Sequence, residues 1–157
     1  MNEGAAFTVA LASSWKNREQ VRILAGLLRF AGISVYDLTD RSCRTTIEQP
    51  PEANPELFDP AQHHYPAYLD RPHWRAAMEE NRRVYSTCKV VVLLLPSGCD
   101  SHADWGLAIG SGARSVVVGH PGAGQRSPDH LWTDAFCDNL EMVPAVVKAL
   151  LEDRHAD

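Results

Sequence analysis

The chain has 157 residues, of which 45% are hydrophobic and 22% are charged. This length and composition are typical of one globular domain with a single core. The formal net charge of -5 argues against nucleic acid polymers and anionic membranes as partners, because clustered Lys and Arg side chains hold such partners.

Short apolar runs alternate with segments of helical periodicity along the chain. The runs that predict strands lie at residues 7–11, 33–38, 90–95 and 115–119, with a short fifth run near 131–137. The segments that predict helices lie at residues 17–30, 72–87, 102–111 and 141–152. The run VVVLLL at 90–95 is apolar on both faces, as expected of a central parallel strand.

Residues 39–70 differ from the rest of the chain. They contain five prolines and show no sustained periodicity, and they lack the Gly and Ser content of a flexible linker. We interpret this segment as a Pro-rich excursion over one rim of the sheet, a kind of long loop that is often functional. No domain boundary is predicted there, so residues 1–157 are expected to form a single domain.

The alternation of strands and helices predicts a doubly wound α/β fold, flavodoxin- or Rossmann-like, with a mainly parallel five-stranded sheet and helices on both faces. Sheets of this kind bind ligands outside the carboxyl ends of their strands, at the point where the strand order reverses. We therefore expect the turns after the first three strands to share one crevice. In chain order these turns are ASSWKN, DLTDR and PSGCDS.

The turn after the first predicted strand offers hydroxyl and backbone N–H groups beside the start of a helix. Ser13 and Ser14 are suited to bind an anion such as a phosphate, and Lys16 and Arg18 add positive charge. The alternative is that Ser14 only caps the helix. Trp15 offers a flat aromatic wall for a base or a sugar.

The turn after the third predicted strand leads into a glycine-rich helical pattern. Ser97 and Gly98 allow a ligand to approach the backbone closely. Two interpretations of Asp104 remain open at this point: it does chemistry on a bound ligand, or it only completes a capping box with Ser101 as N-cap. The helix dipole also stabilises a carboxylate in the first turn without any function.

We expect no metal site and no other cofactor. Asp100, His102 and Asp104 are spaced at i, i+2 and i+4, so their side chains converge poorly on one ion. The sequence starts without the basic segment and long apolar run of a signal peptide, and its longest apolar run is too short to cross a bilayer. The four cysteines form no CxxC pair, which favours reduced thiols in a cytoplasmic protein.

Three stretches, by their order and spacing, are similar to one known family. They are ALASSW after the first strand, MEENRRVYSTCK leading into VVVLLLPSG, and SHADWGLAIGSG followed by SVVVG. The chain resembles the nucleoside 2-deoxyribosyltransferase-like family, which includes nucleoside and nucleotide N-glycoside hydrolases. The resemblance covers most of the chain outside residues 39–70. It implies a doubly wound, five-stranded parallel sheet and assembly as a homodimer or a higher homo-oligomer.

The resemblance also implies a catalytic pair. In the family, a Glu on the helix after the third turn attacks the anomeric carbon, and an Asp from the preceding helix assists the base. These positions match Asp104 and Asn81, so this sequence departs from the family at both. Asp104 keeps the charge on a shorter side chain, whereas Asn81 can hydrogen-bond a base but cannot protonate it. His102 or a loop histidine would then supply the acid.

The leading hypothesis is hydrolysis, or transfer, at the N-glycosidic bond of a nucleoside or nucleoside 5'-monophosphate, with Asp104 as nucleophile or electrostatic stabiliser. The alternative is a non-catalytic nucleotide-binding or sensor module, which explains the preserved turns and the altered pair together. A third hypothesis is a scaffold for protein contacts through the Pro-rich segment. The expected substrate-binding residues are Ala12, Ser13, Ser14, Trp15, Asp37, Ser97, Gly98 and Ser101.

Overall fold

The computed structural model of the chain describes residues 7–40, 61, 64, 66, 70, 72–123 and 127–153. Within these residues, five parallel strands form one sheet in the order β2-β1-β3-β4-β5. The strands are β1 (Val9–Ser13), β2 (Val35–Tyr36), β3 (Val90–Leu94), β4 (Arg114–Val118) and β5 (Ala135–Cys137). The helices are α1 (Arg18–Phe30), α3 (Pro72–Tyr85), α4 (Cys99–Gly110) and α5 (Val143–Glu152), with short 3-10 helices η1 (Trp15–Asn17), η3 (Pro128–Trp132) and η4 (Leu140–Met142).

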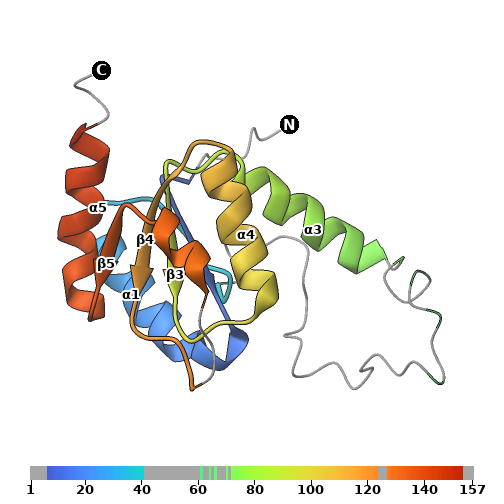
Figure 1. Ribbon diagram of the computed structural model, residues 1–157. Helices are drawn as coiled ribbons and strands as arrows, with labels where there is room; N and C mark the ends of the chain where they lie inside the picture. The colour runs from blue at the N-terminus through green and yellow to red at the C-terminus, as the bar shows by residue number, and fades with distance from the viewer. Residues whose placement is uncertain are drawn as a thin grey trace, which may run out of the picture.

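Helices cover both faces of the sheet (Figure 1). One core cluster joins α1 and α5 to the sheet, with Val21 and Val147 among its buried residues. A second cluster joins α3 and α4 to the opposite face and contains the buried rings of Tyr85 and Trp105. The doubly wound, flavodoxin-like α/β fold predicted from the sequence is therefore confirmed.

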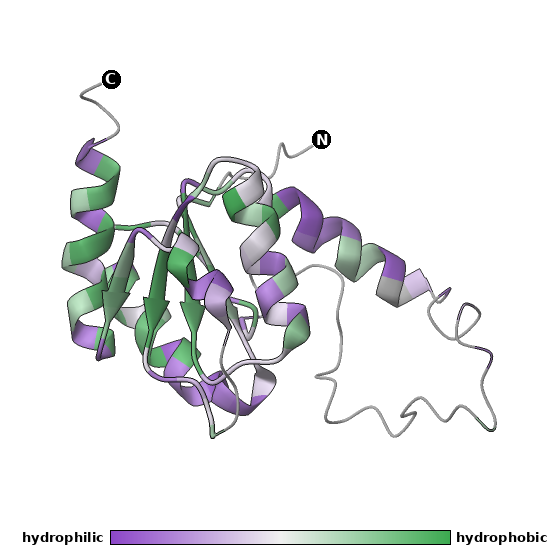
Figure 2. Ribbon diagram, in the orientation of Figure 1, coloured by the Kyte–Doolittle hydropathy of each residue, from purple (hydrophilic) through white to green (hydrophobic). Residues whose placement is uncertain are grey.

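The strands form where the sequence is apolar and rich in β-branched residues. All five residues of β3 are buried, and β3 pairs in parallel with β1 on one side and β4 on the other. Branched side chains pack well on a pleated surface that is covered on both faces. Figure 2 shows these strands as hydrophobic, between helices that carry hydrophilic residues on their outer sides.

Helix α1 forms because its apolar residues recur at helical spacing. Val21, Leu24, Ala25 and Leu28 make up its buried side. The helix ends before Gly32, whose φ of 80° lies in the left-handed region that glycine adopts without strain. The chain then turns directly into β2 at the edge of the sheet.

The helical spacing of residues 72–87 predicts a buried side of α3 made of Trp74, Met78, Val84 and Tyr85. Val84 and Tyr85 are buried as predicted, but Met78 is 57% exposed, and Ala77 and Glu80 are buried in its place. Residues three to four positions apart lie on one face of a helix, and this face packs against the sheet and α4. Trp74, also expected on the buried side, has a side chain outside the described residues.

The predicted excursion over residues 39–70 lies almost entirely outside the described residues. The structure describes its first two residues, Thr39 and Asp40, and four later positions. No helix within the described part of the chain is long and apolar enough to cross a membrane.

Candidate functional site

The strand order of the sheet reverses beside β1. The chain passes from β1 outward to β2 and then returns to form β3 on the other side of β1. In doubly wound sheets, this reversal leaves a place for ligands at the carboxyl ends of the two central strands. The turns after β1 and β3 lie at that place.

Asn17 joins the turn after β1 to the turn after β3. Its Nδ2 donates to the carbonyl oxygen of Pro96 at 2.6 Å and to the hydroxyl oxygen of Ser13 at 3.0 Å. The Ser13 hydroxyl donates in turn to the carbonyl oxygen of Leu94 at 2.9 Å. Sequence reasoning did not single out Asn17. Its position at the end of the turn ASSWKN could have indicated this role, because an amide side chain there can reach the end of a neighbouring strand.

Two other residues of the first turn have structural contacts. The Ser14 hydroxyl accepts from the backbone N–H of Lys16 at 3.3 Å, so Ser14 is a cap, although it caps η1 rather than α1. Trp15 is half-buried and packs against the core cluster on the α1 and α5 face. Lys16 and Arg18 are exposed at the same turn. The turn therefore presents positive charge beside the carboxyl end of β1.

Ala12 and Asp37 are buried and support the fold at the carboxyl ends of β1 and β2. Ala12 is paired with Leu93 of β3. Asp37 follows β2, and its Oδ1 accepts from the backbone N–H of Thr39 at 2.7 Å and from the Thr39 hydroxyl at 2.8 Å. This turn, in which a side-chain oxygen replaces a backbone acceptor, directs the chain away from the edge of the sheet.

Asn81 and Asp104 come together between α3 and α4. The Asn81 Nδ2 donates to Asp104 Oδ2 at 3.2 Å, and the Tyr36 hydroxyl donates to Asn81 Oδ1 at 3.4 Å. The Tyr36 ring is fully buried and packs edge-on against Tyr85, whose hydroxyl donates to the carbonyl oxygen of Leu11 at 2.7 Å. Buried aromatic rings thus orient the amide, and the amide orients the carboxylate.

The capping-box interpretation of Asp104 is wrong. Helix α4 begins at Cys99, and its N-cap is Gly98, which offers no side-chain cap. Ser101 is therefore the third residue of the helix rather than its N-cap, and it is buried. Gly98 has an extended backbone, which starts the helix directly after the turn. Asp104 consequently lies beyond the first helical turn, where its carboxylate meets Asn81 instead of the backbone.

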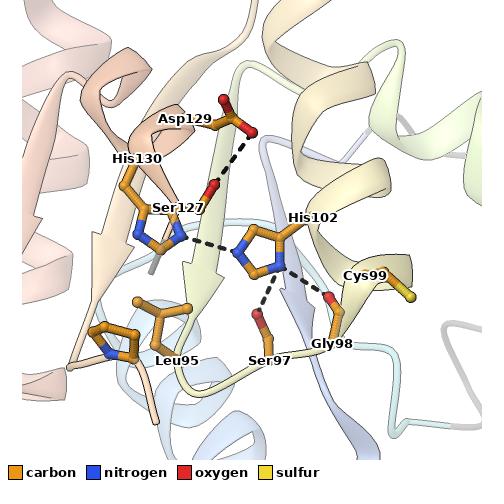
Figure 3. A pocket seen from close by; sticks show the side chains of 9 residues that line it. Leu95, Ser97, Gly98, Cys99, His102, Ser127, Asp129 and His130 are labelled. Carbon is orange, nitrogen blue, oxygen red and sulfur yellow. Dashed lines mark hydrogen bonds between the residues drawn. The ribbon is translucent and has the colours of Figure 1, made fainter. Parts of the chain in front are cut away.

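His102 projects from α4 away from Asp104, because two residues along a helix turn the side chain by about 200°. Its Nδ1 lies 2.9 Å from the carbonyl oxygen of Gly98 and 3.4 Å from Ser97 Oγ. Its Nε2 lies 2.9 Å from Nε2 of His130, which comes from η3. Figure 3 shows the two rings pointing toward each other. The structure therefore places His102 and Asp104 on different sides of one helix.

Trp105 fixes the rotation of α4. It is 1% exposed, and its Nε1 donates to Ser115 Oγ of β4 at 2.7 Å. Ser115 Oγ also lies 3.1 Å from Thr133 Oγ1. Because Trp105 follows Asp104 directly, this buried anchor holds the Asp104 carboxylate toward α3.

A cavity of about 360 Å³ lies on the His102 side of α4 (Figure 3). Its volume is within the usual range of small-molecule sites. Sequence reasoning missed this cavity, although the loop HPGAGQRSPDH follows the carboxyl end of the fourth strand and so belongs to the same edge of the sheet. The cavity is lined by Leu95, Ser97, Gly98, Cys99, His102, Pro121, Ser127, Asp129 and His130.

The surroundings of His130 lower the pKa of its ring. Removal of the ring from water and the neighbouring His102 lower the pKa of His130 below its usual value, and the Asp129 carboxylate opposes this shift. Desolvation disfavours the charged imidazolium, and a second imidazole disfavours it further. His130 is therefore more readily neutral than an exposed histidine.

No three or more His, Cys, Asp or Glu side chains in the described part of the chain are grouped so that they could hold a metal ion. No model of a known protein family matches the chain, and no curated protein sequence matches it significantly. The functional inference consequently depends on the geometry of the site.

Proposed function

We propose that this protein cleaves the N-glycosidic bond of a nucleoside or a nucleoside 5'-monophosphate, with Asp104 facing the anomeric carbon. The observation that supports this most directly is the 3.2 Å hydrogen bond from Asn81 to Asp104. It holds a half-buried carboxylate beside an amide, next to the place where doubly wound sheets bind nucleotides. A carboxylate suits the sugar in such a reaction, and an amide suits the base.

The proposed reaction begins with cleavage of the bond between the anomeric carbon and the base nitrogen, whose electron pair leaves with the base. The sugar then has oxocarbenium character, which the Asp104 carboxylate stabilises by charge or captures as a covalent ester. Water adds its hydroxyl group to the anomeric carbon, and its remaining proton balances the charge on the released base. Hydrolysis requires fewer specific contacts than transfer to a second base, so we propose hydrolysis.

Asn81 positions the carboxylate in this mechanism. Its amide carries two N–H donors; one holds Asp104, and the other is suited to hydrogen-bond the base or the sugar. An amide cannot transfer a proton, so the site favours a base that leaves without strong acid assistance. The ring of His102 contacts His130, and we assign no proton transfer at the base to it.

A phosphorylated substrate fits the first turn. Lys16 and Arg18 are exposed there, and local positive charge raises the affinity for a 5'-phosphate. Ser13 and Asn17 hold this turn against the turn after β3, so the two turns present a fixed surface to the sugar and the phosphate.

A non-catalytic nucleotide-binding or sensor module is the second candidate. Asn81 favours it, because its amide hydrogen-bonds Asp104 and cannot act as an acid. The nucleotide would occupy the same crevice, and no bond would be broken.

We also propose that the protein works in the cytoplasm as a homo-oligomer. Cys99 and Cys137, within the described part of the chain, are free thiols, which supports a reducing compartment. Leu131, Trp132 and Phe136, on or beside the edge strand β5, are 81%, 63% and 58% exposed. Exposed apolar side chains of this size support burial against a second copy.

Base release, followed by chromatography, tests the proposed reaction. The wild-type protein is incubated with nucleosides, 2'-deoxynucleosides, their 5'-monophosphates and a dinucleotide. We expect a free base and a sugar or sugar phosphate from at least one nucleoside or monophosphate. If no base appears while a monophosphate still raises the melting temperature, the protein is the binding module instead.

A further inference from the structure

The His102–His130 pair lies outside the site proposed for glycoside cleavage and needs its own explanation. The two rings come from α4 and η3, with centroids 5.2 Å apart and planes inclined by 22°. Both line the 360 Å³ cavity together with the hydroxyl-bearing Ser97 and Ser127. Figure 3 shows these side chains around one open space. Two imidazoles and two hydroxyls thus face a cavity, and the cleavage proposal uses only its Ser97 and Gly98 side, in the turn after β3.

Hydrogen bonding defines which ring nitrogens carry hydrogen. The Gly98 carbonyl only accepts, so His102 Nδ1, at 2.9 Å, donates to it. In the neutral ring His102 Nε2 is then an acceptor, and His130 Nε2, at 2.9 Å, is its donor. Neutral His130 consequently has a bare Nδ1. The neutral pair is therefore arranged to accept one further proton at this nitrogen.

A proton at this nitrogen makes His130 an imidazolium, while its Nε2–H still donates to Nε2 of His102. The pair then carries one positive charge beside the cavity, a state that a bound anion stabilises. The lowered pKa of His130 agrees with a ring that takes up this proton together with an anion.

We propose that this cavity binds a small tetrahedral oxyanion, of the phosphate or sulfate class, together with one proton taken up by the His102–His130 pair. The His130 imidazolium and the hydroxyl of Ser97 supply hydrogen-bond donors to its oxygens. Leu95 and Pro121 line the rest of the cavity. The volume leaves room for an organic part the size of a sugar.

Neighbouring charges restrict when the anion binds. Asp129 lies beside His130, and its Oδ2 accepts from Ser127 Oγ at 3.2 Å. With a neutral pair the site carries the single negative charge of Asp129, which repels an anion. One proton on His130 brings the sum to zero and removes this repulsion. The elements that enclose the pair carry, within the described residues, the further titratable groups Cys99, Asp100, Asp104, His120 and Asp134.

Titration calorimetry with sulfate tests the site, because sulfate keeps its charge between about pH 6 and about pH 8. Uptake of one proton by His130 predicts that Kd rises with pH, by about tenfold per pH unit where the ring is neutral. Repeating the titration in two buffers of different ionisation enthalpy measures the uptake directly on the wild-type protein. An uptake of about one proton is expected, and an uptake of zero overturns the proposal.

Two variants locate the binding. His130→Gln and His102→Gln should each weaken sulfate at least about tenfold at the lower pH, as loss of a charge-assisted bond does. His120→Gln, which changes an exposed histidine outside the cavity lining, serves as the matched control, and melting temperatures establish that the variants fold. Wild-type affinity in both cavity variants would overturn the proposal.

Three probes define the class of ligand. A sugar phosphate should bind more tightly than sulfate, because its organic part contacts Leu95 and Pro121. Acetate should bind more weakly than sulfate, because it has fewer acceptor oxygens. Acetate binding as tight as sulfate would overturn the assignment to a tetrahedral oxyanion. Asp104→Asn should lose base release and keep sulfate binding, so failure of this proposal is distinct from failure of the proposed cleavage.

Discussion

Asn81 and Asp104, 23 residues apart in the sequence, meet through a 3.2 Å hydrogen bond that joins α3 to α4. The Tyr36 hydroxyl from β2 orients the same amide. Two helices on one face of the sheet and its edge strand β2 therefore determine where the carboxylate lies. Changes at either residue should therefore alter both the free energy of unfolding and the rate of base release.

A double-mutant cycle should detect the bond. Asn81→Ala, Asp104→Ala and the double variant are compared by urea unfolding. We expect a coupling free energy of about 1 kcal/mol, the usual net value of such a hydrogen bond in a half-buried place. A matched cycle of Asn81 with Asp100, an exposed acid in the first turn of α4, should give a coupling near zero. Equal couplings in the two cycles would contradict the assigned contact.

Asn17→Ala should loosen the two turns. The change removes the donors to Pro96 and Ser13, and we expect a loss of about 1–2 kcal/mol in the free energy of unfolding together with weaker binding of a nucleoside 5'-monophosphate. Thermal unfolding and calorimetry measure the two effects. Gln20→Ala, an exposed amide on α1, is the control and should change neither. Unchanged monophosphate affinity in Asn17→Ala would mean that the joined turns do not form the binding surface.

Asn81→Asp should restore an acid beside Asp104. Two carboxyl groups at this distance cannot both ionise easily, so the pair retains a shared proton to higher pH than a lone carboxyl group. That proton can be passed to the leaving base, and we expect faster base release, most clearly at acidic pH. Rates from about pH 5 to about pH 8 follow the effect. A rate that is lower than that of the wild type at every pH would show that the amide itself is required.

The stability of the protein should fall in acid partly because of His130. Its pKa is lowered in the folded state from 6.5, so the unfolded chain binds more protons in this range, and the stability contributed by the neutral ring is present above 6.5 and lost as the pH falls through the folded-state pKa. We expect the melting temperature in chloride buffer to drop less steeply between about pH 7 and about pH 5 for His130→Gln than for the wild type. His120→Gln is the control. The same slope in His130→Gln and the wild type would contradict the lowered pKa.

The fold could be predicted because each strand is short, apolar and separated by segments of helical periodicity. The β3 run is the clearest example, since its residues are buried on both faces. The start of α4 was predicted three residues too late, because Ser101 is a preferred N-cap residue whereas the helix is in fact capped at Gly98 and begins at Cys99. Because α4 begins directly after Gly98, Asp104 lies beyond the first turn of the helix. Its carboxylate therefore accepts a hydrogen bond from Asn81 and does not complete the predicted capping box.

The site could be predicted only in part. Asp104 and Asn81 were paired through a family resemblance rather than by periodicity, since α3 and α4 meet only through tertiary packing. The contact between His102 and His130 spans 28 residues and depends on the path of the Gly- and Pro-rich connection after β4. No local pattern encodes that path, so this contact needed the structure.

Base release by Asp104→Asn, compared with the wild type on the best substrate, is the most direct measurement of the central proposal. The variant keeps the size of the side chain and loses its charge. We expect the rate to fall by about 100- to 1000-fold, as when one group that stabilises the transition state is removed, while the Kd of a non-cleaved monophosphate stays within about twofold. Base release at the wild-type rate would contradict the role of Asp104.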